Sequence, residues 1–247
     1  MPTLSVAIVA CDEERDLPRC LDSVRFADER IVVDSGSRDR TREVAAAAGA
    51  RLVDQPWLGY GAQKAFAFAQ ATGDWILSLD ADEALSPDLA AAIPEAISRA
   101  RGDGFRLRFR SRMFGRTLRF GGFGHESHLR LFRRGRARGD GRAIHEGITV
   151  DGPVATLPGH VLHEPYATLS EYLVKLERYS TLAARERRAA GRRFSPLAAA
   201  RLPWGFFRRY VLWLGLLDGY AGYLAASLGA LSDFLKDAKL QELERVG

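Results

Sequence analysis

Residues 75–83 read WILSLDADE, an apolar run that ends abruptly in three carboxylates within four positions. The first five residues have the length and composition of a strand buried on both faces. Three acidic side chains at the end of such a strand repel one another unless a positive charge lies among them. Asp80 and Asp82, one residue apart, point to the same side of an extended chain and could share a divalent cation such as Mg²⁺ or Mn²⁺. The alternative is a solvated acidic turn before a helix that starts at Ser86 and Pro87.

The composition of the 247-residue chain is that of a globular protein, with 47% hydrophobic and 27% charged residues. Its length allows one large domain, or a domain with a helical appendage. The two cysteines, Cys11 and Cys20, suggest neither a disulfide framework nor a zinc site and favour a reducing compartment. The N-terminal residues lack the basic start of a signal peptide and are expected to form a first strand.

Charge is distributed unevenly along the chain. Residues 1–100 carry 10 Lys+Arg and 17 Asp+Glu, a net charge of −7, whereas the remaining residues carry 26 and 14, a net charge of +12. An acidic half that can hold a metal is thus joined to a basic half suited to an anionic partner. Nucleic acid, anionic lipid and a phosphorylated substrate all satisfy that condition.

The first hundred residues alternate short apolar runs with helical patterns. This β-α-β-α-β-α-β order predicts an α/β protein with a parallel sheet and helices on both faces. Ligands of such sheets bind at the carboxyl ends of the strands, where Asp12, Asp34, Asp80 and Asp82 all lie. Asp12 and the two glutamates after it are expected in the first turn of a helix, where acidic groups suit the helix dipole. The expected strands are residues 4–10, 31–33, 51–53 and 75–79.

Three segments in this order carry a resemblance: LSVAIVACDEE (4–14), IVVDSGSRDRT (31–41) and GYGAQKAFAFAQATGDWILSLDADE (59–83). Together they resemble family 2 glycosyltransferases with the GT-A fold, a Rossmann-like, mostly parallel sheet with helices on both faces. The resemblance departs from the family at Cys11-Asp12, where an aromatic residue followed by Asn is usual. It also departs at Ala65, where many relatives have Asn.

The resemblance implies roles for the acidic residues of this half. Asp34 contacts the base or ribose of a nucleotide, Asp80 lies near the ribose and the metal, and Asp82 binds the metal on the diphosphate. Lys64 resembles a position close to the nucleotide pocket, and Asp12 is expected in the same nucleotide-sugar site. A divalent metal would neutralise the charge that develops on the diphosphate leaving group. As alternatives, Asp34 could form an Asx-turn or helix cap, and Lys64 could be a solvated helix lysine.

Residues 101–142 are rich in arginine, with 13 arginines, no lysine and three acids. The alternation at 105–112 predicts a strand with one charged face, and residues 129–132 predict another strand. Residues 121–124 are expected to form a mobile loop near the site. The surplus of positive charge favours a nearby anion. Nucleic acid is the weaker candidate, because no helix-turn-helix, zinc-finger or RNP-like pattern is present.

Three further segments narrow the resemblance: RLFRR (130–134), IHE (144–146) and LHEPYATLSEYLVKLERYS (162–180). They are similar to the bacterial lipopolysaccharide core branch of family 2, commonly β-1,4-glucosyltransferases. This implies a UDP-glucose donor and, as acceptor, an inner-core heptose on a phosphorylated lipid anchor, which arginines can bind through bidentate phosphate contacts. One alternative is a polyprenyl-phosphate or exopolysaccharide acceptor. Another is a non-catalytic basic binding module on a nucleotide-binding scaffold.

Transfer with inversion needs a carboxylate that takes the proton of the acceptor hydroxyl. The metal carboxylates face the diphosphate, so the base is expected after the first hundred residues. Glu146 is the preferred candidate, because IHE resembles the HE motif of the family, and Glu126 in GFGHESH is the runner-up. Asp140 fits a turn, and Glu164 lies at the expected exit from the catalytic domain. His163 is predicted to contact the nucleotide or metal, with a buried core histidine as the alternative.

The expected domains are a GT-A catalytic domain at 1–165 and a helical segment at 166–247. Residues 169–186 have a helical pattern, and two apolar stretches follow at 203–217 and 219–232. Each is shorter than the roughly 18–20 residues that a spanning helix needs, and Asp218 would be costly within a joint span. We expect one or two helices in the membrane interface, at the cytoplasmic face of the bacterial inner membrane. Packing against the catalytic domain or a second subunit is the alternative.

Overall fold

The structure is a computed structural model that describes residues 1–100, 102–139, 148–166 and 168–246. Glu146 and Asp140, two of the candidate bases, therefore lie outside the described residues. The chain divides into two compact units. The sheet unit comprises Met1–Phe109 and Glu126–His163, and the helical unit comprises Arg110–His125 and Glu164–Gly247.

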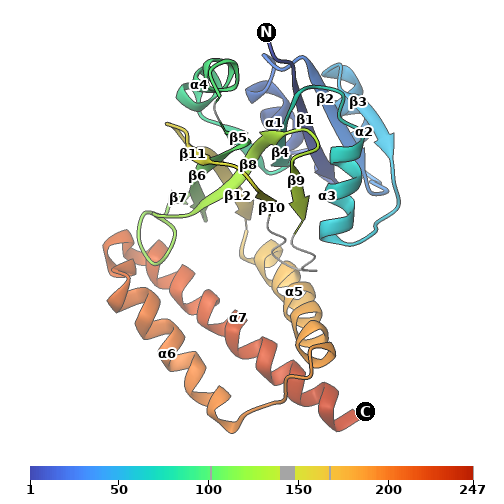
Figure 1. The fold of residues 1–247 in the computed structure, drawn as a ribbon. Coiled ribbons are helices and arrows are strands. Elements are labelled where there is room, and N and C mark those ends of the chain that lie inside the picture. Colours follow the sequence, from blue (N-terminus) through green and yellow to red (C-terminus); the bar gives the residue numbers. More distant parts are fainter. Residues whose placement is uncertain (101, 140–147, 167, 247) are drawn as a thin grey trace. The chain divides into compact units, whose positions relative to one another are not determined.

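The sheet unit is built around one sheet with the strand order β3-β2-β1-β4-β8-β6-β12-β5 (Figure 1). Strand β1 (Leu4–Ala10) pairs in parallel with both β2 (Glu29–Asp34) and β4 (Trp75–Asp80), and β2 pairs in parallel with β3 (Arg51–Asp54). The apolar runs of the sequence form these strands as predicted, because β1 and β4 are covered on both faces and apolar side chains lose water contact there.

The second half of the sheet is antiparallel. Strand β8 (Ser127–Arg133) pairs with β4 on one side and with β6 (Gly104–Met113) on the other. Side chains of β6 alternate between buried apolar and exposed arginine, which confirms the predicted charged face. The remaining strands are β5 (Glu83–Leu85), β7 (Arg116–Thr117), β9 (Ala137–Gly139), β10 (Ile148–Val150), β11 (Val154–Thr156) and β12 (Val161–Tyr166).

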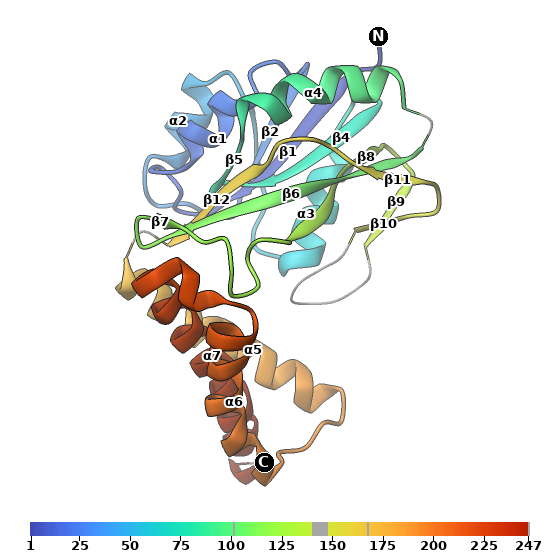
Figure 2. The ribbon, with the colours of Figure 1, turned by 90° about the vertical axis from the view of Figure 1, so that its left-hand side faces the viewer.

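Helices cover both faces of the sheet (Figure 2). Helices α1 (Leu17–Ser23), α2 (Thr41–Ala47) and α4 (Pro87–Ser98) contribute to the larger core, and α3 (Tyr60–Ala69) packs on the opposite face. Helix α4 begins at Pro87 after an extended Ser86, as predicted. The expectation for Asp12 is wrong: α1 begins only at Leu17, and its first turn contains no acid.

The helical unit consists of three long helical stretches and residues 110–125, which include the end of β6, the strand β7 and the loop that follows it. Helix α5 (Leu169–Ala189) and helix α7 (Gly219–Val246) flank a bent path formed by η1 (Pro196–Ala200), α6 (Arg201–Phe207), η2 (Arg208–Leu212) and η3 (Gly215–Asp218). Helices α6 and α7 approach closely where a Cβ on Gly205 would lie 3.3 Å from the side chain of Ala230. Such small residues allow two helix backbones to pack tightly.

The buried face of α5 includes only some of its large apolar residues. Tyr172 and Leu176 are buried, but Leu169 and Leu173 are exposed. Tyr172 and Leu176 pack against Met113 and Leu118 of the loop region and against α7, in a core separate from that of the sheet. The stripe that α5 buries continues through Ser180 and Ala184, whose small side chains an apolar pattern does not reveal.

No single described helix is both long and apolar enough to cross a bilayer. The stretches Pro196–Leu212 and Gly215–Arg245 satisfy that test only as a pair, and they are bent by 73° at the break between them.

Candidate active site

The site lies where β4 ends. Asp80 is the last residue of β4, the chain turns at Ala81 and Asp82, and Glu83 begins β5. The extended geometry expected for the two aspartates is therefore replaced by a turn. Helix α1 supports that turn, because the Arg19 guanidinium donates a hydrogen bond to the backbone oxygen of Asp82 at 2.9 Å.

Asp80 is held between two cations. The Lys64 ammonium, on α3, lies 2.9 Å from one carboxylate oxygen of Asp80, and the Arg130 guanidinium, on β8, lies 3.2 Å from the other. Burial alone would raise the pKa of Asp80, but these two positive charges lower it well below its usual range. Lys64 is only 16% exposed, so it is not the solvated helix lysine considered as an alternative. The Asp80 carboxylate is ionised at any physiological pH.

Glu83 is a buried acid that shares the same arginine. Its carboxylate lies 2.8 Å from Arg130 and accepts a hydrogen bond of 2.9 Å from the backbone N–H of Asp80. Burial, together with the negative charges of Asp80 and Asp82, raises the pKa of Glu83 to about 7, although Arg130 opposes the shift. One arginine thus serves two carboxylates, and the site holds more negative charge than Arg130 can balance.

Asp82 is paired with the predicted histidine. The Nε2 atom of His163 lies 3.6 Å from a carboxylate oxygen of Asp82. His163 reaches this place because β12 runs antiparallel to β5 and sets His163 opposite Glu83. Burial lowers the pKa of His163, but the carboxylates of Asp82, Glu83 and Asp80 outweigh that effect and raise it.

Phe109 lies between this cluster and the side chain that contacts Glu126, one of the candidate bases. Its ring has the Arg130 guanidinium at 5.3 Å over one face and meets the His128 ring edge-on at 4.9 Å. His128 Nε2 lies 2.9 Å from the Glu126 carboxylate. The hydrogen bond to His128 lowers the pKa of Glu126, burial opposes it, and the charges of His163 and Arg130 add to the lowering. Glu126 is therefore an ionised carboxylate close to the cluster, whereas Glu146 lies outside the described residues.

Asp34 and Asp12 organise the neighbouring loops. The buried Asp34 carboxylate accepts hydrogen bonds from the backbone N–H groups of Gly36 and Ser37. This is the Asx-turn geometry considered as the alternative to nucleotide contact, and the nucleotide role of Asp34 stays a prediction. Asp12, at a positive φ of 57°, accepts a hydrogen bond of 2.7 Å from the backbone N–H of Arg38 and so ties the loop after β1 to the loop after β2.

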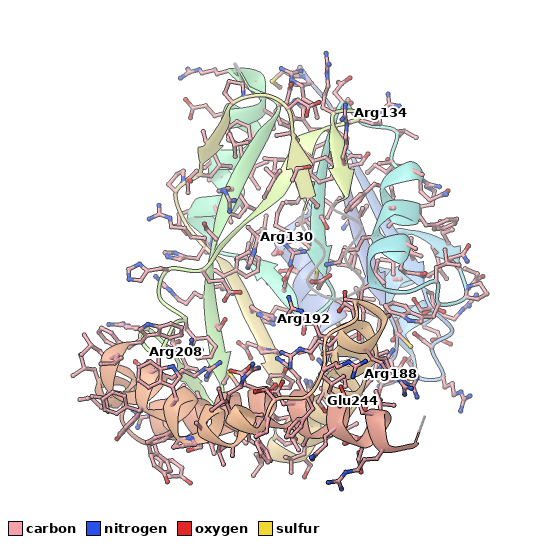
Figure 3. All side chains as sticks on the ribbon, turned by 60° about the horizontal axis from the view of Figure 1, so that its bottom comes forward. Arg130, Arg134, Arg188, Arg192, Arg208 and Glu244 are labelled. Carbon is pink, nitrogen blue, oxygen red and sulfur yellow. The ribbon has the colours of Figure 1, made fainter. Side chains whose placement is uncertain are left out.

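Arg130 and Glu83 are the residues that sequence reasoning did not place in the site. In the sequence, Arg130 stands out only as part of RLFRR, and Glu83 only as the last acid of the strand-end motif. The repulsion among the three acids requires a cation but does not say which one. The signal lies in strand pairing: β8 runs antiparallel to β4 with Leu131 opposite Leu77, which brings Arg130 to the end of β4. Figure 3 labels Arg130 among the strands of the sheet unit.

The described residues contain no group of three or more His, Cys, Asp and Glu side chains arranged to hold a metal ion. The Asp82 and His163 atoms, 3.6 Å apart, are close enough to bind one ion together. The Asp82 carboxylate suits Mg²⁺ or Mn²⁺, which protein sites commonly bind through one or two carboxylates while phosphate oxygens and water complete the coordination, whereas an imidazole such as that of His163 is more typical of Zn²⁺ and Cu²⁺ sites. The donor chemistry therefore fits a metal that arrives with a diphosphate.

The chain is similar to known glycosyltransferases. Residues 5–120 match the model of glycosyl transferase family 2. The chain is 33% identical over 250 residues to the lipopolysaccharide core biosynthesis glycosyltransferase LpsC of Rhizobium meliloti (strain 1021), covering 97% of this chain and 92% of that protein. It is 28% identical to the uncharacterized glycosyltransferase RT0209 of Rickettsia typhi, covering 98% of this chain and 88% of that one.

Among solved structures, glucosyl-3-phosphoglycerate synthase from Mycobacterium tuberculosis in complex with Mn²⁺, UDP and glucosyl-3-phosphoglycerate is 27% identical. Its TM-score is 0.38, and the match covers 46% of this chain and 45% of that one, too little to decide the fold. The relation to LpsC does span nearly the whole chain, and the sheet has the parallel half, the antiparallel half and the acidic strand end expected of the GT-A fold. The chain belongs to glycosyl transferase family 2 and is a glycosyltransferase.

Proposed function

We propose that the protein is an inverting hexosyltransferase. It takes a hexose, glucose in the first instance, from a nucleotide diphosphate donor such as UDP-glucose and transfers it to a phosphorylated, lipid-linked bacterial glycan, the lipopolysaccharide inner core. The observation that carries the proposal is the charge pattern at the end of β4. Asp80 is held by Lys64 and Arg130, while Asp82 and His163 form a pair that suits a divalent cation.

On the donor side of the site, different residues would hold the metal and bind the nucleotide. Asp82 and His163 would hold Mg²⁺ or Mn²⁺, which supplies positive charge to the diphosphate as it leaves. Lys64 and Arg130 keep the Asp80 carboxylate ionised and oriented, so that it can accept hydrogen bonds from ribose hydroxyls. Asp12 and Asp34 hold the two loops that follow β1 and β2, next to the same edge of the sheet.

The acceptor side must supply a base. In a single displacement, the acceptor oxygen bonds to the anomeric carbon while the bond from that carbon to the diphosphate oxygen breaks. The electron pair of that bond leaves with the diphosphate, and the acceptor proton passes to a carboxylate. Glu126 is a described carboxylate suited to this step, because it is ionised and close to the cluster. Glu146 remains the other candidate.

The acceptor is inferred from the relative and from charge. LpsC is a lipopolysaccharide core biosynthesis glycosyltransferase and is similar along almost the whole chain. The arginines on the exposed face of β6 provide guanidinium groups for phosphates on such an acceptor. A lipid-linked acceptor places the enzyme at the cytoplasmic face of the inner membrane, as a peripheral protein.

Donor use is tested first. A thermal-shift screen of nucleotide sugars with and without Mn²⁺ should show stabilisation by one UDP-hexose only when the metal is present. Asp82→Ala should abolish that shift and lower turnover by roughly 10²–10³-fold, the scale for losing one group that stabilises developing charge. Asp22→Ala, which removes an exposed carboxylate of α1, is the matched control. Unchanged turnover of the Asp82 variant in EDTA would refute the metal role.

Acceptor and base are tested next. Transfer of radiolabelled hexose to inner-core lipopolysaccharide, rather than to a polyprenyl-phosphate lipid, should appear when the products are extracted and separated. The base is the residue whose Gln variant loses roughly 10²–10⁴-fold in kcat with normal donor binding. Comparing Glu126→Gln with Glu146→Gln decides between the two candidates. If both variants turn over normally, neither is the base.

A further inference from the structure

The helical unit exposes a concentrated apolar surface where α6 meets α7. We call residues 204–223 the apolar apex. Half of the large hydrophobic side chains that are exposed in the described part of the chain lie in this short segment. They include several aromatic residues and are Trp204, Phe207, Val211, Leu212, Trp213, Leu214, Leu216, Leu217, Tyr220 and Tyr223. An exposed apolar area of this density marks an interaction surface.

One arginine of the apex, Arg209, is paired on the inner side of the helical unit. The Arg209 guanidinium lies 2.8 Å from the Asp233 carboxylate and also donates to the backbone oxygen of Gly205. A Cβ on Gly229 would lie 2.9 Å from Nε of Arg209, so the backbone of α7 packs closely against this side chain. Arg209 is already paired with Asp233. Covering the apolar outer face of the apex would therefore not bury an unpaired charge.

The apex carries arginine next to its aromatic side chains. Residues 204–217 contain Arg208 and Arg209 and no acidic residue, and Arg209 is paired with Asp233. Within the apex, the Arg208 guanidinium lies over the Trp213 ring at 4.7 Å, and its buried Nε has no hydrogen-bond partner among the described residues. Figure 3 shows Arg208 at the opposite end of the helices from Arg188 and Arg192. Tryptophan and tyrosine beside arginine are typical of the headgroup level of a bilayer.

We propose that the apolar apex binds the surface of an anionic bilayer and enters it without crossing it. Charge favours this occupant over a second copy of the chain, because Arg208, which lies in the apex over the Trp213 ring, would face its own equivalent across a symmetric interface. The bend of 73° and the short apolar stretches exclude a single spanning helix among the described residues but fit a shallow hairpin. Asp218, costly within a span, need not enter the hydrocarbon in this arrangement.

The apex also forms hydrogen bonds to the glycine-rich loop, residues 119–124. The Asp218 carboxylate accepts hydrogen bonds of 2.9 and 2.8 Å from the backbone N–H groups of Arg119 and Phe120. The backbone oxygen of Trp213 accepts one of 2.8 Å from Gly121. A Cβ on Gly122 would lie 3.1 Å from the Trp213 ring, so the loop backbone rests against that ring. Loop residues 119–122 are therefore fixed to the membrane-binding segment itself.

This attachment gives bilayer binding a consequence for the acceptor side. Residues 123–125 connect the loop directly to Glu126 in the chain. When the apex is held at the bilayer, the backbone of residues 119–122 is held with it, and fewer conformations remain for the segment that leads to Glu126. This part of the inference rests on the proposed function, in which Glu126 faces a lipid-linked acceptor, whereas lipid binding itself does not.

Vesicle flotation tests lipid binding without any nucleotide sugar. Full-length protein should float with phosphatidylglycerol-containing vesicles and much less with pure phosphatidylcholine. The double variant Leu217→Glu/Tyr220→Glu should reduce the bound fraction at least about tenfold, since it adds charge to the inserted surface. Val174→Glu, on α5, is the matched control, because Val174 is 73% exposed and Tyr220 78%. Equal loss in the control, or a stable dimer in sedimentation that the double variant dissolves, would overturn the bilayer assignment.

Hydrogen exchange tests the link to the loop. With anionic vesicles present, the amides of residues 119–121 should exchange at least several-fold more slowly than without them. Asp218→Ala should abolish that slowing at residues 119 and 120, in protein that still floats with the vesicles, because the variant removes the acceptor of these two loop hydrogen bonds. Vesicle binding with no change in loop exchange in the native protein would refute the link. A protein that floats but does not transfer hexose would refute the proposed function and leave the membrane surface standing.

Discussion

Each unit contains a cluster of carboxylate and guanidinium groups, but the ratio of acids to arginines is opposite in the two clusters. In the sheet unit, Arg130 lies between two carboxylates, Asp80 and Glu83. In the helical unit, Asp237 lies between two guanidinium groups, those of Arg187 and Arg201, at 2.6 and 3.1 Å. In the first arrangement one guanidinium serves two carboxylates and Lys64 is a second cation for Asp80, whereas the second arrangement joins α5, α6 and α7 through one carboxylate. The first arrangement lies next to Asp82 and His163, the pair that could hold a metal ion, whereas the second connects helices.

The largest expected effect comes from removing the shared arginine. Arg130→Met leaves Glu83 and Asp80 without their common cation and should lower the free energy of unfolding by about 3–5 kcal/mol, the scale for breaking a buried pair. Denaturant titration measures this loss. Glu83→Gln in the same chain should restore most of it, because the unpaired buried charge is removed.

Arg25→Met is the control for this substitution, because Arg25 is 77% exposed and forms only a surface pair with Asp22. If Arg130→Met costs no more than Arg25→Met, the comparison between the two units fails on the sheet side.

A smaller effect is expected for the shared aspartate. Asp237→Asn should lower the free energy of unfolding by about 1–2 kcal/mol, less than a fully buried pair, because Arg187 and Arg201 keep partial access to water. UDP-hexose binding, measured by calorimetry with Mn²⁺, should not change. A variant that loses donor affinity along with stability would show that Asp237 does more than connect helices.

Much of the sheet unit follows from its sequence because its signals are local. The apolar runs predict β1, β2, β3 and β4, and parallel strands place their carboxyl ends at one edge. Those two facts are enough to single out Asp80 and Asp82 from the sequence alone. The long α5 and the charged face of β6 are local patterns of the same kind.

The missed features depend on contacts between distant segments. Arg130 reaches Asp80 only through the antiparallel pairing of β8 with β4, and no pattern within β8 states that register. The turn at Ala81–Asp82 and the binding of loop residues by Asp218 are likewise decided by backbone hydrogen bonds that composition does not reveal. The negative charge of the acids after β1 suits the start of a helix, which is why the sequence places them there. In the structure Asp12 instead accepts a hydrogen bond from the backbone N–H of Arg38 and holds the neighbouring loop.

The smallest expected effect is a pH dependence in the helical unit. Burial alone would raise the pKa of Asp233, but its hydrogen bonds and charge interactions with Arg209 and Lys236 lower it. A carboxyl whose pKa is lower in the folded protein binds fewer protons there than in the unfolded chain. Its contribution to stability is therefore complete above the unfolded pKa, about 3.9, and is lost as the pH falls through the folded value.

Asp233→Asn removes this contribution. The variant should be less stable than the native protein at pH 6, and the difference should shrink as the pH is lowered below about 4, where Asp233 binds a proton in the unfolded chain but stays ionised in the native protein. Urea titrations of both proteins between pH 6 and pH 3 measure that convergence. Asp22→Asn, which neutralises an exposed carboxylate, is the control. A difference between native and Asp233→Asn proteins that stays constant down to pH 3 would mean that the pair with Arg209 contributes packing rather than charge to the apolar apex.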